Sequence, residues 1–141
     1  MLETNLSAVF YGGRAVAPHL IAQQRGKVIN VASVLGAVGL PGYAIYSAAK
    51  GGVIALTRTL GVEWARHGIQ VNALAPGWFA TDMTNEAFAD PAINQRLTRD
   101  IPARRIGRAE EIGPLAVYLA SAASDFMTGQ TVFLDGGHSA A

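Results

Sequence analysis

The stretch KVINVASVLGAVGLPGYAIYSAAK, residues 27–50, decides how this chain folds. It starts with an apolar run rich in β-branched residues, 27–32, which predicts a buried parallel strand that ends at Ser33. Four glycine or proline residues between positions 36 and 42 then interrupt regular structure. A helical pattern begins near Tyr43. The stretch therefore predicts a strand, a loop and the start of a long helix.

The helix carries Tyr46 and Lys50 four residues apart, which places both side chains on one face. A tyrosine hydroxyl, with an ordinary pKa of about 10, is a poor proton donor or acceptor at neutral pH. A lysine ammonium one turn away favours the phenolate, because opposite charge stabilises the ionised form. Ser33 ends its strand at the carboxyl edge of the sheet, where its hydroxyl can polarise a carbonyl. Together the three residues predict acid–base catalysis, whereas the tyrosine and lysine alone would be typical of an exposed pair.

Ser33, the Tyr46-x-x-x-Lys50 element and the sequence around them resemble the short-chain dehydrogenase/reductase family over nearly the whole chain. The resemblance implies that a nicotinamide cofactor, NAD or NADP, passes a hydride while these residues transfer a proton between a secondary alcohol and a carbonyl. It also implies that Asn5 joins a proton relay, so the catalytic set is Asn5, Ser33, Tyr46 and Lys50. The alternative for Asn5 is a plain helix N-cap.

The segment from Asn72 to Pro76-Gly77, followed by Thr81-Asp82-Met83, is similar to the family's loop around the nicotinamide end of the cofactor. The resemblance implies that Thr81 bonds the carboxamide and that Phe79 lines the pocket; the alternative for Thr81 is a Thr-Asp helix cap. The implied cofactor-binding residues are Tyr46, Lys50, Pro76, Gly77, Phe79 and Thr81. The ketoacyl-carrier-protein reductase and sugar-dehydrogenase branches are both similar, which leaves the small-molecule substrate open. Thr128-Gly-Gln and Asp135-Gly-Gly resemble the family's last strand and turn, and we expect them to be structural.

The family's glycine-rich Thr-Gly-x-x-x-Gly-x-Gly turn, which receives the pyrophosphate, is not found in this sequence. Residues 1–5 enter the family pattern in mid-domain, so roughly the first four strands are expected to be missing. The expected fold class is α/β, a partial Rossmann-type doubly wound parallel sheet of three C-terminal strands with their helices. Residues 1–141 would form the C-terminal catalytic portion of one domain, with 84–108 as its substrate-loop region.

The missing strands predict a sheet edge at residues 28–31 with unpaired amides, which invites association with another chain. Apolar residues on several sides of the helices 6–24 and 43–67 add to this expectation of a homo-oligomer, a dimer or tetramer. The rival hypothesis is a truncated, non-catalytic fragment that acts only in subunit association. We expect weak cofactor affinity for the chain alone in either case.

Composition excludes several other classes. The 141 residues are 50% hydrophobic and 15% charged, typical of one heavily buried domain, and the net charge of +1 provides no basic field for nucleic acid. The lack of cysteine and of a signal-peptide pattern fits the cytoplasm. Residues 28–49 carry no charge, but their glycines, prolines and polar groups argue against a membrane span. The three histidines lie far apart, so we expect no metal site and place them on the surface.

The rest of the chain predicts regular elements around a polar insertion. The polar segment 84–108 is typical of a mobile lid over a substrate site, with a solvated surface loop as the alternative. Its arginines suggest either an acidic substrate or carrier protein, or ordinary solvent exposure. The expected helices are 6–24, bent at Pro18 and stopped by Arg25-Gly26; 43–67, ended by Gly68; and 109–121. In the first turn of the last helix, Glu110 and Glu111 match the helix dipole. The expected strands are 69–75 and 131–134.

Overall fold

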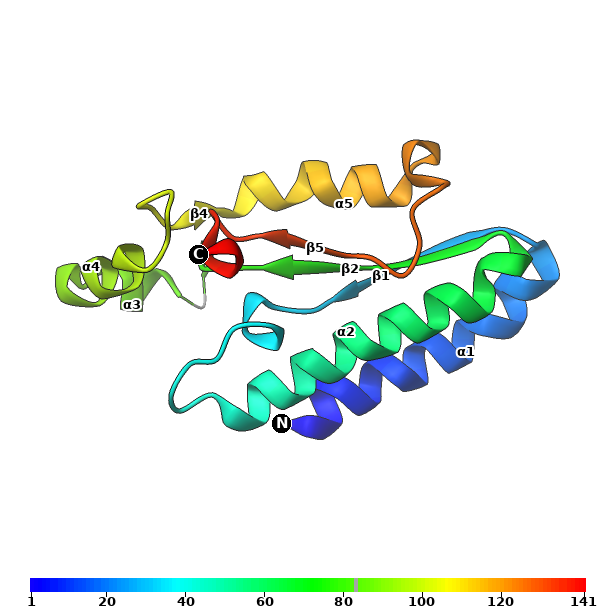
Figure 1. The fold of residues 1–141 in the computed structure, drawn as a ribbon, viewed down its shortest axis with the longest axis horizontal. Coiled ribbons are helices and arrows are strands. Elements are labelled where there is room, and N and C mark those ends of the chain that lie inside the picture. The colour runs from blue at the N-terminus through cyan, green and yellow to red at the C-terminus, as the bar shows by residue number, and fades with distance from the viewer. Residues whose placement is uncertain (83) are drawn as a thin grey trace.

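A three-stranded parallel sheet forms the centre of the molecule (Figure 1). The computed structural model describes residues 1–82 and 84–141. The strands β1 (Gly26–Val31), β2 (Ile69–Pro76) and β5 (Thr131–Leu134) lie in the order β1-β2-β5. Every pairing in this sheet is parallel, which requires crossover connections between neighbours. The expected fold class, a partial Rossmann-type α/β sheet, is confirmed.

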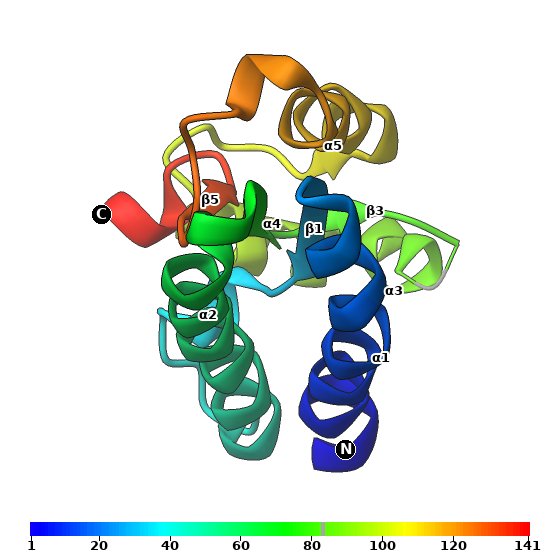
Figure 2. The same cartoon turned by 90° about the vertical axis from the view of Figure 1, so that its right-hand side faces the viewer.

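Helices cover both faces of the sheet. Figures 1 and 2 show α1 and α2 side by side beneath it and α5 on the opposite face. The layers follow from the connections, because each parallel crossover must pass over a face of the sheet. The helical elements are η1 (Glu3–Ser7, a π-helical turn), α1 (Ala8–Gln23), η2 (Val34–Gly36), α2 (Ala44–Trp64), η3 (Ala65–His67), α3 (Asn85–Ala89), α4 (Pro91–Arg99), η4 (Ala109–Glu111), α5 (Ile112–Ala120), η5 (Ala122–Ser124) and η6 (His138–Ala140).

The long helix α2 joins the sheet to the other helices. Val53 of α2 is fully buried against Ala73 and Ala75 of β2, and Trp64 packs with Ile69 and Val71. The other side of the helix remains apolar but exposed: 60% of Ile45 and 75% of Val62 are accessible. One face of α2 therefore packs on the sheet, while the opposite face offers apolar surface to solvent.

The end of α1 differs from the sequence prediction. The helix stops at Gln23, and Gln24 rather than a glycine adopts the left-handed conformation, with φ 52°. Gly26 belongs to β1, where a Cβ would lie 2.9 Å from Leu20 Cδ2, so close helix packing explains the glycine. The predicted stop at Arg25-Gly26 is therefore wrong. Gly68, by contrast, makes the expected turn after η3 with φ 69°.

The polar segment 84–108 is mainly helical rather than a plain loop. It holds α3 and α4, which project beyond the carboxyl end of the sheet (Figure 1). Two short strands, β3 (Phe79–Ala80) and β4 (Gly107–Arg108), pair in parallel and bring the two ends of the excursion together. The excursion is thus anchored at its base.

The first strand lies at the edge of the sheet, as predicted. Within the described part of the chain, β1 pairs with β2 alone, and 57% of Val31 is accessible. No helix among residues 1–82 and 84–141 is both long and apolar enough to cross a membrane. The uncharged stretch 28–49 instead contains strand, loop and helix, as expected.

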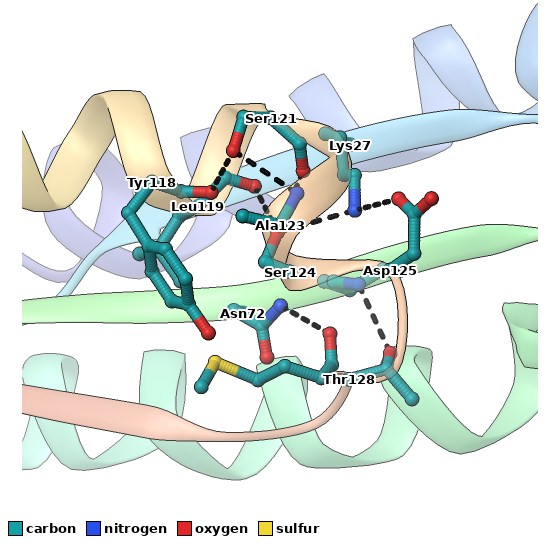
Figure 3. A network of polar contacts seen from close by, with 11 residues as sticks. Lys27, Asn72, Tyr118, Leu119, Ser121, Ala123, Ser124, Asp125 and Thr128 are labelled. Atoms are coloured by element: carbon teal, nitrogen blue, oxygen red, sulfur yellow. Dashed lines mark hydrogen bonds and ion pairs between the residues drawn. The ribbon is translucent and has the colours of Figure 1, made fainter.

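A network of polar contacts fixes the amino end of the sheet (Figure 3). Lys27 Nζ lies 2.7 Å from Asp125 Oδ1 and donates to Ser124 Oγ at 3.1 Å. The fully buried Asn72 donates to the Met127 carbonyl at 2.7 Å and accepts from the Gln130 amide at 3.1 Å. These contacts hold the turn that leads into β5.

Candidate active site

Tyr46 and Lys50 share one face of α2, as their spacing predicts. Lys50 Nζ lies 5.7 Å from the centroid of the Tyr46 ring. Lys50 also donates a 2.8 Å hydrogen bond to the carbonyl of Val31, which ties the end of β1 to α2. Only 9% of Lys50 is accessible, and this burial lowers its pKa. A cation is thus held close to the tyrosine by the fold.

Ser33 lies two residues beyond the end of β1, which stops at Val31, and caps the short helix η2. Its hydroxyl oxygen accepts from the Leu35 amide at 3.2 Å, so its own proton can be donated elsewhere. Gly36, at the end of η2, lies so close to α2 that a Cβ would stand 2.8 Å from the Lys50 carbonyl carbon. This contact brings the serine turn against the helix that carries Tyr46.

A cavity of about 310 Å³ opens at the carboxyl ends of β1 and β2. Parallel α/β sheets bind ligands at this edge. Six predicted site residues line the cavity: Ser33, Tyr46, Pro76, Gly77, Phe79 and Thr81. It is also lined by residues that the sequence analysis did not assign: Val34, Leu35, Tyr43, Trp78, Thr84, Phe88 and Ile112.

Gly77 can only be a glycine in this arrangement. Its amide donates to the Leu134 carbonyl at 2.9 Å, and a Cβ would lie 2.8 Å from Asp135 Cα. The Asp135 carboxylate in turn accepts from the amides of Gly137 and Ser139, as expected for a structural turn. Burial alone would raise the pKa of Asp135, but these hydrogen bonds and nearby His138 hold it below its ordinary value.

Thr81 is held by a neighbour that the sequence analysis missed. Its hydroxyl lies 3.0 Å from the hydroxyl of Thr84, which donates to the Phe79 carbonyl at 2.8 Å and accepts from the Thr81 amide at 2.9 Å. The N-cap residue of α3 is Thr84, so the alternative of a Thr81-Asp82 cap is wrong. Met83, the third residue of that motif, lies outside the described residues.

Asn5 lies outside the cavity. It sits within η1, and its side-chain amide donates to the carbonyl of Met1 at 3.2 Å. Because helical structure begins before it, the N-cap alternative is wrong. The turn packs against α2, since a Cβ on Gly52 would stand 2.9 Å from Leu6 Cδ1. Single π-helical turns are frequent at functional sites, and the relay role of Asn5 stays a prediction.

Glu111 anchors the base of the helical excursion rather than only matching a helix dipole. Both its carboxylate oxygens accept from Arg105, at 2.7 and 2.8 Å, and one accepts from the Arg108 amide at 2.8 Å. The hydrogen bonds from Arg105 and then from Arg108 lower the pKa of Glu111 to about 2. Arg105 and Arg108 are thus paired within the chain.

The histidines need a correction. His138 is half-buried rather than on the surface, and its Nδ1 atom is buried with no hydrogen-bond partner among the described residues. His67 is also half-buried, but its hydrogen bonds with Gln24 and Arg66 lie in exposed positions. His19 is exposed, as predicted. In the described part of the chain, no group of three histidine, aspartate or glutamate side chains is placed to hold a metal ion.

Fold and site together define the class: the chain belongs to the short-chain dehydrogenase/reductase family. Residues 1–139 match the family described as enoyl-(acyl carrier protein) reductase. Over 137 residues the chain is 46% identical to gluconate 5-dehydrogenase of Gluconobacter oxydans and 43% identical to 3-oxoacyl-(acyl-carrier-protein) reductase FabG of Staphylococcus epidermidis. These matches cover 97% of this chain and 54% and 55% of the two relatives.

A solved structure agrees with these sequence relatives. The crystal structure of a gluconate 5-dehydrogenase from Burkholderia cenocepacia J2315, in complex with NADP and tartrate, superposes with a TM-score of 0.92 at 46% identity. The superposition covers 97% of this chain and 54% of the solved one. The chain therefore spans about half the length of the relatives that it matches.

Proposed function

We propose that this chain provides the catalytic half of an NAD(P)-dependent oxidoreductase that interconverts a secondary alcohol and a carbonyl. One observation carries the proposal: Ser33 and Tyr46 line the same cavity at the carboxyl edge of the sheet, with the Lys50 ammonium beside the Tyr46 ring. The named activities of the relatives, gluconate 5-dehydrogenase and 3-oxoacyl-carrier-protein reductase, are both of this reaction type.

The residues fit the nicotinamide end of such a cofactor. Pro76, Gly77, Phe79 and Thr81 lie along the cavity next to Tyr46, and Gly77 lets the backbone turn where a side chain would clash. The Lys50 ammonium donates one hydrogen bond to the Val31 carbonyl, and its other N–H groups can donate to ribose hydroxyls. When bound, the cofactor supplies or accepts the hydride.

Each of the four proposed catalytic side chains takes part in proton transfer or in binding of the substrate carbonyl. Tyr46 gives its proton to the carbonyl oxygen in the reductive direction, and Lys50 favours the resulting phenolate by its charge. Ser33 donates a hydrogen bond to the same oxygen and orients it. Asn5 belongs to the path that returns a proton to Tyr46.

The proposal is tested by completing the enzyme. The chain is joined behind the N-terminal portion of the Gluconobacter oxydans relative that the match leaves uncovered. We expect this fusion to oxidise NADPH or NADH in the presence of 5-keto-D-gluconate or a 3-oxoacyl thioester. A folded fusion that binds the cofactor but turns over neither carbonyl would overturn the proposal.

A second candidate is a non-catalytic fragment that acts in subunit association. The exposed edge strand β1 and the apolar outer surfaces of α1 and α2, including Phe10, Tyr11 and Val62, favour it. The same surfaces support a homo-oligomer, so light scattering on the purified chain should report a dimer, a tetramer or larger species. A well-folded monomer at micromolar concentration would contradict this expectation.

Cofactor affinity distinguishes a complete cofactor site from one that binds only the nicotinamide end. Pyrophosphate is bound by backbone amides at a glycine turn and helix N-terminus, which the first half of the relatives would have to provide. Calorimetric titration of the chain alone with NADH and NADPH should therefore show weak binding. Submicromolar binding would reveal another phosphate site within these residues.

A further inference from the structure

Four aromatic rings connect α2, the helix that carries Tyr46 and Lys50, to α3. The ring of Tyr43 lies 6.4 Å from that of Tyr46 and 6.5 Å from that of Trp78, and Trp78 lies 6.4 Å from Phe88. The interplanar angles are 74°, 80° and 83°, so each pair meets edge to face. This is a favourable geometry for aromatic pairs.

The rings come from three separate elements. Tyr43 and Tyr46 belong to the start of α2, Trp78 follows β2, and Phe88 lies in α3. Tyr43, Tyr46, Trp78 and Phe88 all line the cavity. Trp78 is the only one with an aromatic neighbour on each of two other elements. It therefore occupies the junction between the acid–base helix and α3.

The backbone of Trp78 is fixed on both sides. The preceding residue, Gly77, donates to the Leu134 carbonyl of β5, and the Trp78 carbonyl accepts from Gly107 of β4 at 2.9 Å. Phe88 is anchored through Thr84: the Phe88 amide donates to the Thr84 carbonyl, and the Thr84 hydroxyl donates to the Phe79 carbonyl. The backbone that carries the indole is thus anchored, and α3 contacts the ring through Phe88.

We propose that Trp78 is a positioning residue that couples the docking of α3 to the orientation of Tyr46, through the rings of Phe88 and Tyr43. This inference rests on the proposed function for its catalytic consequence. Its structural part stands on the four rings alone. The contact of α3 with the indole would then hold the Tyr46 proton donor in its orientation toward the cavity.

Tyrosine ring resonances test the coupling in the chain itself. The sequence has four tyrosines, Tyr11, Tyr43, Tyr46 and Tyr118, so selective labelling gives a small and assignable set of signals. Phe88→Ala removes the ring furthest from Tyr46 and should shift the Tyr43 and Tyr46 signals but leave Tyr11 and Tyr118 unchanged. Phe126→Ala, which removes a fully exposed ring, is the matched control and should shift neither Tyr43 nor Tyr46. Unchanged Tyr43 and Tyr46 signals in Phe88→Ala would overturn the coupling.

Trypsin reports the docking of the helices independently of activity. The helix α4 carries the exposed Arg96 and Arg99, and release of α3 should loosen the helical backbone at both sites so that trypsin can cut it. Trp78→Ala should be cleaved there several times faster than the unmodified chain, whereas Trp78→Phe should be close to it because an aromatic ring remains. If Trp78→Ala fails to fold, the same comparison is made between Phe88→Ala and Phe126→Ala. Equal cleavage rates would contradict the proposal.

Kinetics of the completed enzyme test the catalytic consequence. Misplacement of a reacting group by about 1 Å can cost about 100-fold, so Trp78→Ala should lower kcat by about 10-fold to 100-fold. The KM for the cofactor should remain within about twofold, and Trp78→Phe should restore most of kcat. A rise in KM with unchanged kcat would assign Trp78 to binding only. Loss of all turnover in the unmodified fusion would count against the proposed function, while the resonance and trypsin results would still decide the coupling.

Discussion

The two ends of the central sheet differ in whether their polar side chains are hydrogen-bonded within the chain or face a cavity. At the amino end, Lys27, Asn72 and Ser124 are bound to partners within the chain (Figure 3). At the carboxyl end, Ser33 and Tyr46 face a cavity, and the hydroxyl proton of Ser33 remains available. Buried polar groups are normally paired, so paired groups stabilise the fold and available ones indicate chemistry.

The largest contrast is expected between two tyrosines. In the completed enzyme, Tyr46→Phe should lower turnover by about 100-fold or more, because general acid–base groups contribute about 10²-fold to 10⁴-fold. Tyr118→Phe, on the opposite face of the sheet, is the matched control and should stay within about twofold. Steady-state reduction of the carbonyl, followed by the loss of NADPH absorbance, measures both. Turnover of Tyr46→Phe within a few times that of the unmodified enzyme would remove Tyr46 from the mechanism.

Two lysines bracket the same strand and offer the next contrast. Lys50→Met should lower kcat by about 10-fold to 100-fold, since each tenfold corresponds to roughly 1.4 kcal/mol of lost phenolate stabilisation. Lys27→Met removes the partly exposed ion pair with Asp125 and should cost about 1 kcal/mol or less of stability. Its kcat should stay within about twofold of the unmodified enzyme. Equal losses of activity in the two variants would refute the assignment of catalysis to the carboxyl end of the sheet alone.

Stability should show the reverse order. Asn72→Ala removes the hydrogen bonds to the Met127 carbonyl and from the Gln130 amide, and should cost about 1–3 kcal/mol, since each of the two bonds contributes about 0.5–1.5 kcal/mol. Ser33→Ala breaks one bond from the Leu35 amide and should cost about 1 kcal/mol. Urea unfolding of the two variants makes the comparison. A larger loss in Ser33→Ala than in Asn72→Ala would mean that the serine is mainly structural.

The smallest effect concerns Glu111, which joins the base of the helical excursion. Its pKa falls from an ordinary 4.5 to about 2, so the carboxylate contributes stability above pH 4.5 that is lost as pH falls toward 2. Trypsin cannot be used in acid, so pepsin cleavage within residues 84–106 is followed between pH 4.5 and 2. Cleavage should accelerate as pH falls, relative to an unstructured peptide control. Glu111→Gln should flatten that dependence; the same pH response in this variant would assign the effect to another group.

Local patterns were sufficient for part of the fold and site. The strand before Ser33, the Tyr46 and Lys50 face and the turn at Gly68 follow from spacing within a few residues. The structure has the last two as predicted, and the strand ends at Val31, two residues before Ser33. The strand 131–134 also matches. These features depend on backbone geometry that the sequence expresses locally.

Features that depend on distant neighbours were missed. The Tyr43, Trp78 and Phe88 rings meet only after α2 has packed on β2 and α3 has come against Trp78, so their separate sequence segments give no periodic signal. The acidic start of the 109–121 helix predicted a dipole effect, but Arg105 folds back to pair with Glu111. Gln24 takes the left-handed turn, while Gly26 lies in the strand, where a Cβ would be too close to Leu20. Tertiary packing, rather than local preference, decides each of these positions.

The central claim is that the carboxyl end of this sheet takes the nicotinamide and that the amino end does not. An amide chemical-shift titration of the chain with reduced nicotinamide mononucleotide tests it without the adenosine half of the cofactor. We predict weak binding with shifts concentrated at Ser33, Tyr46 and Gly77, and none at Asn72 or Ser124. Shifts confined to the amino end, or no shift at saturating nucleotide, would contradict the account.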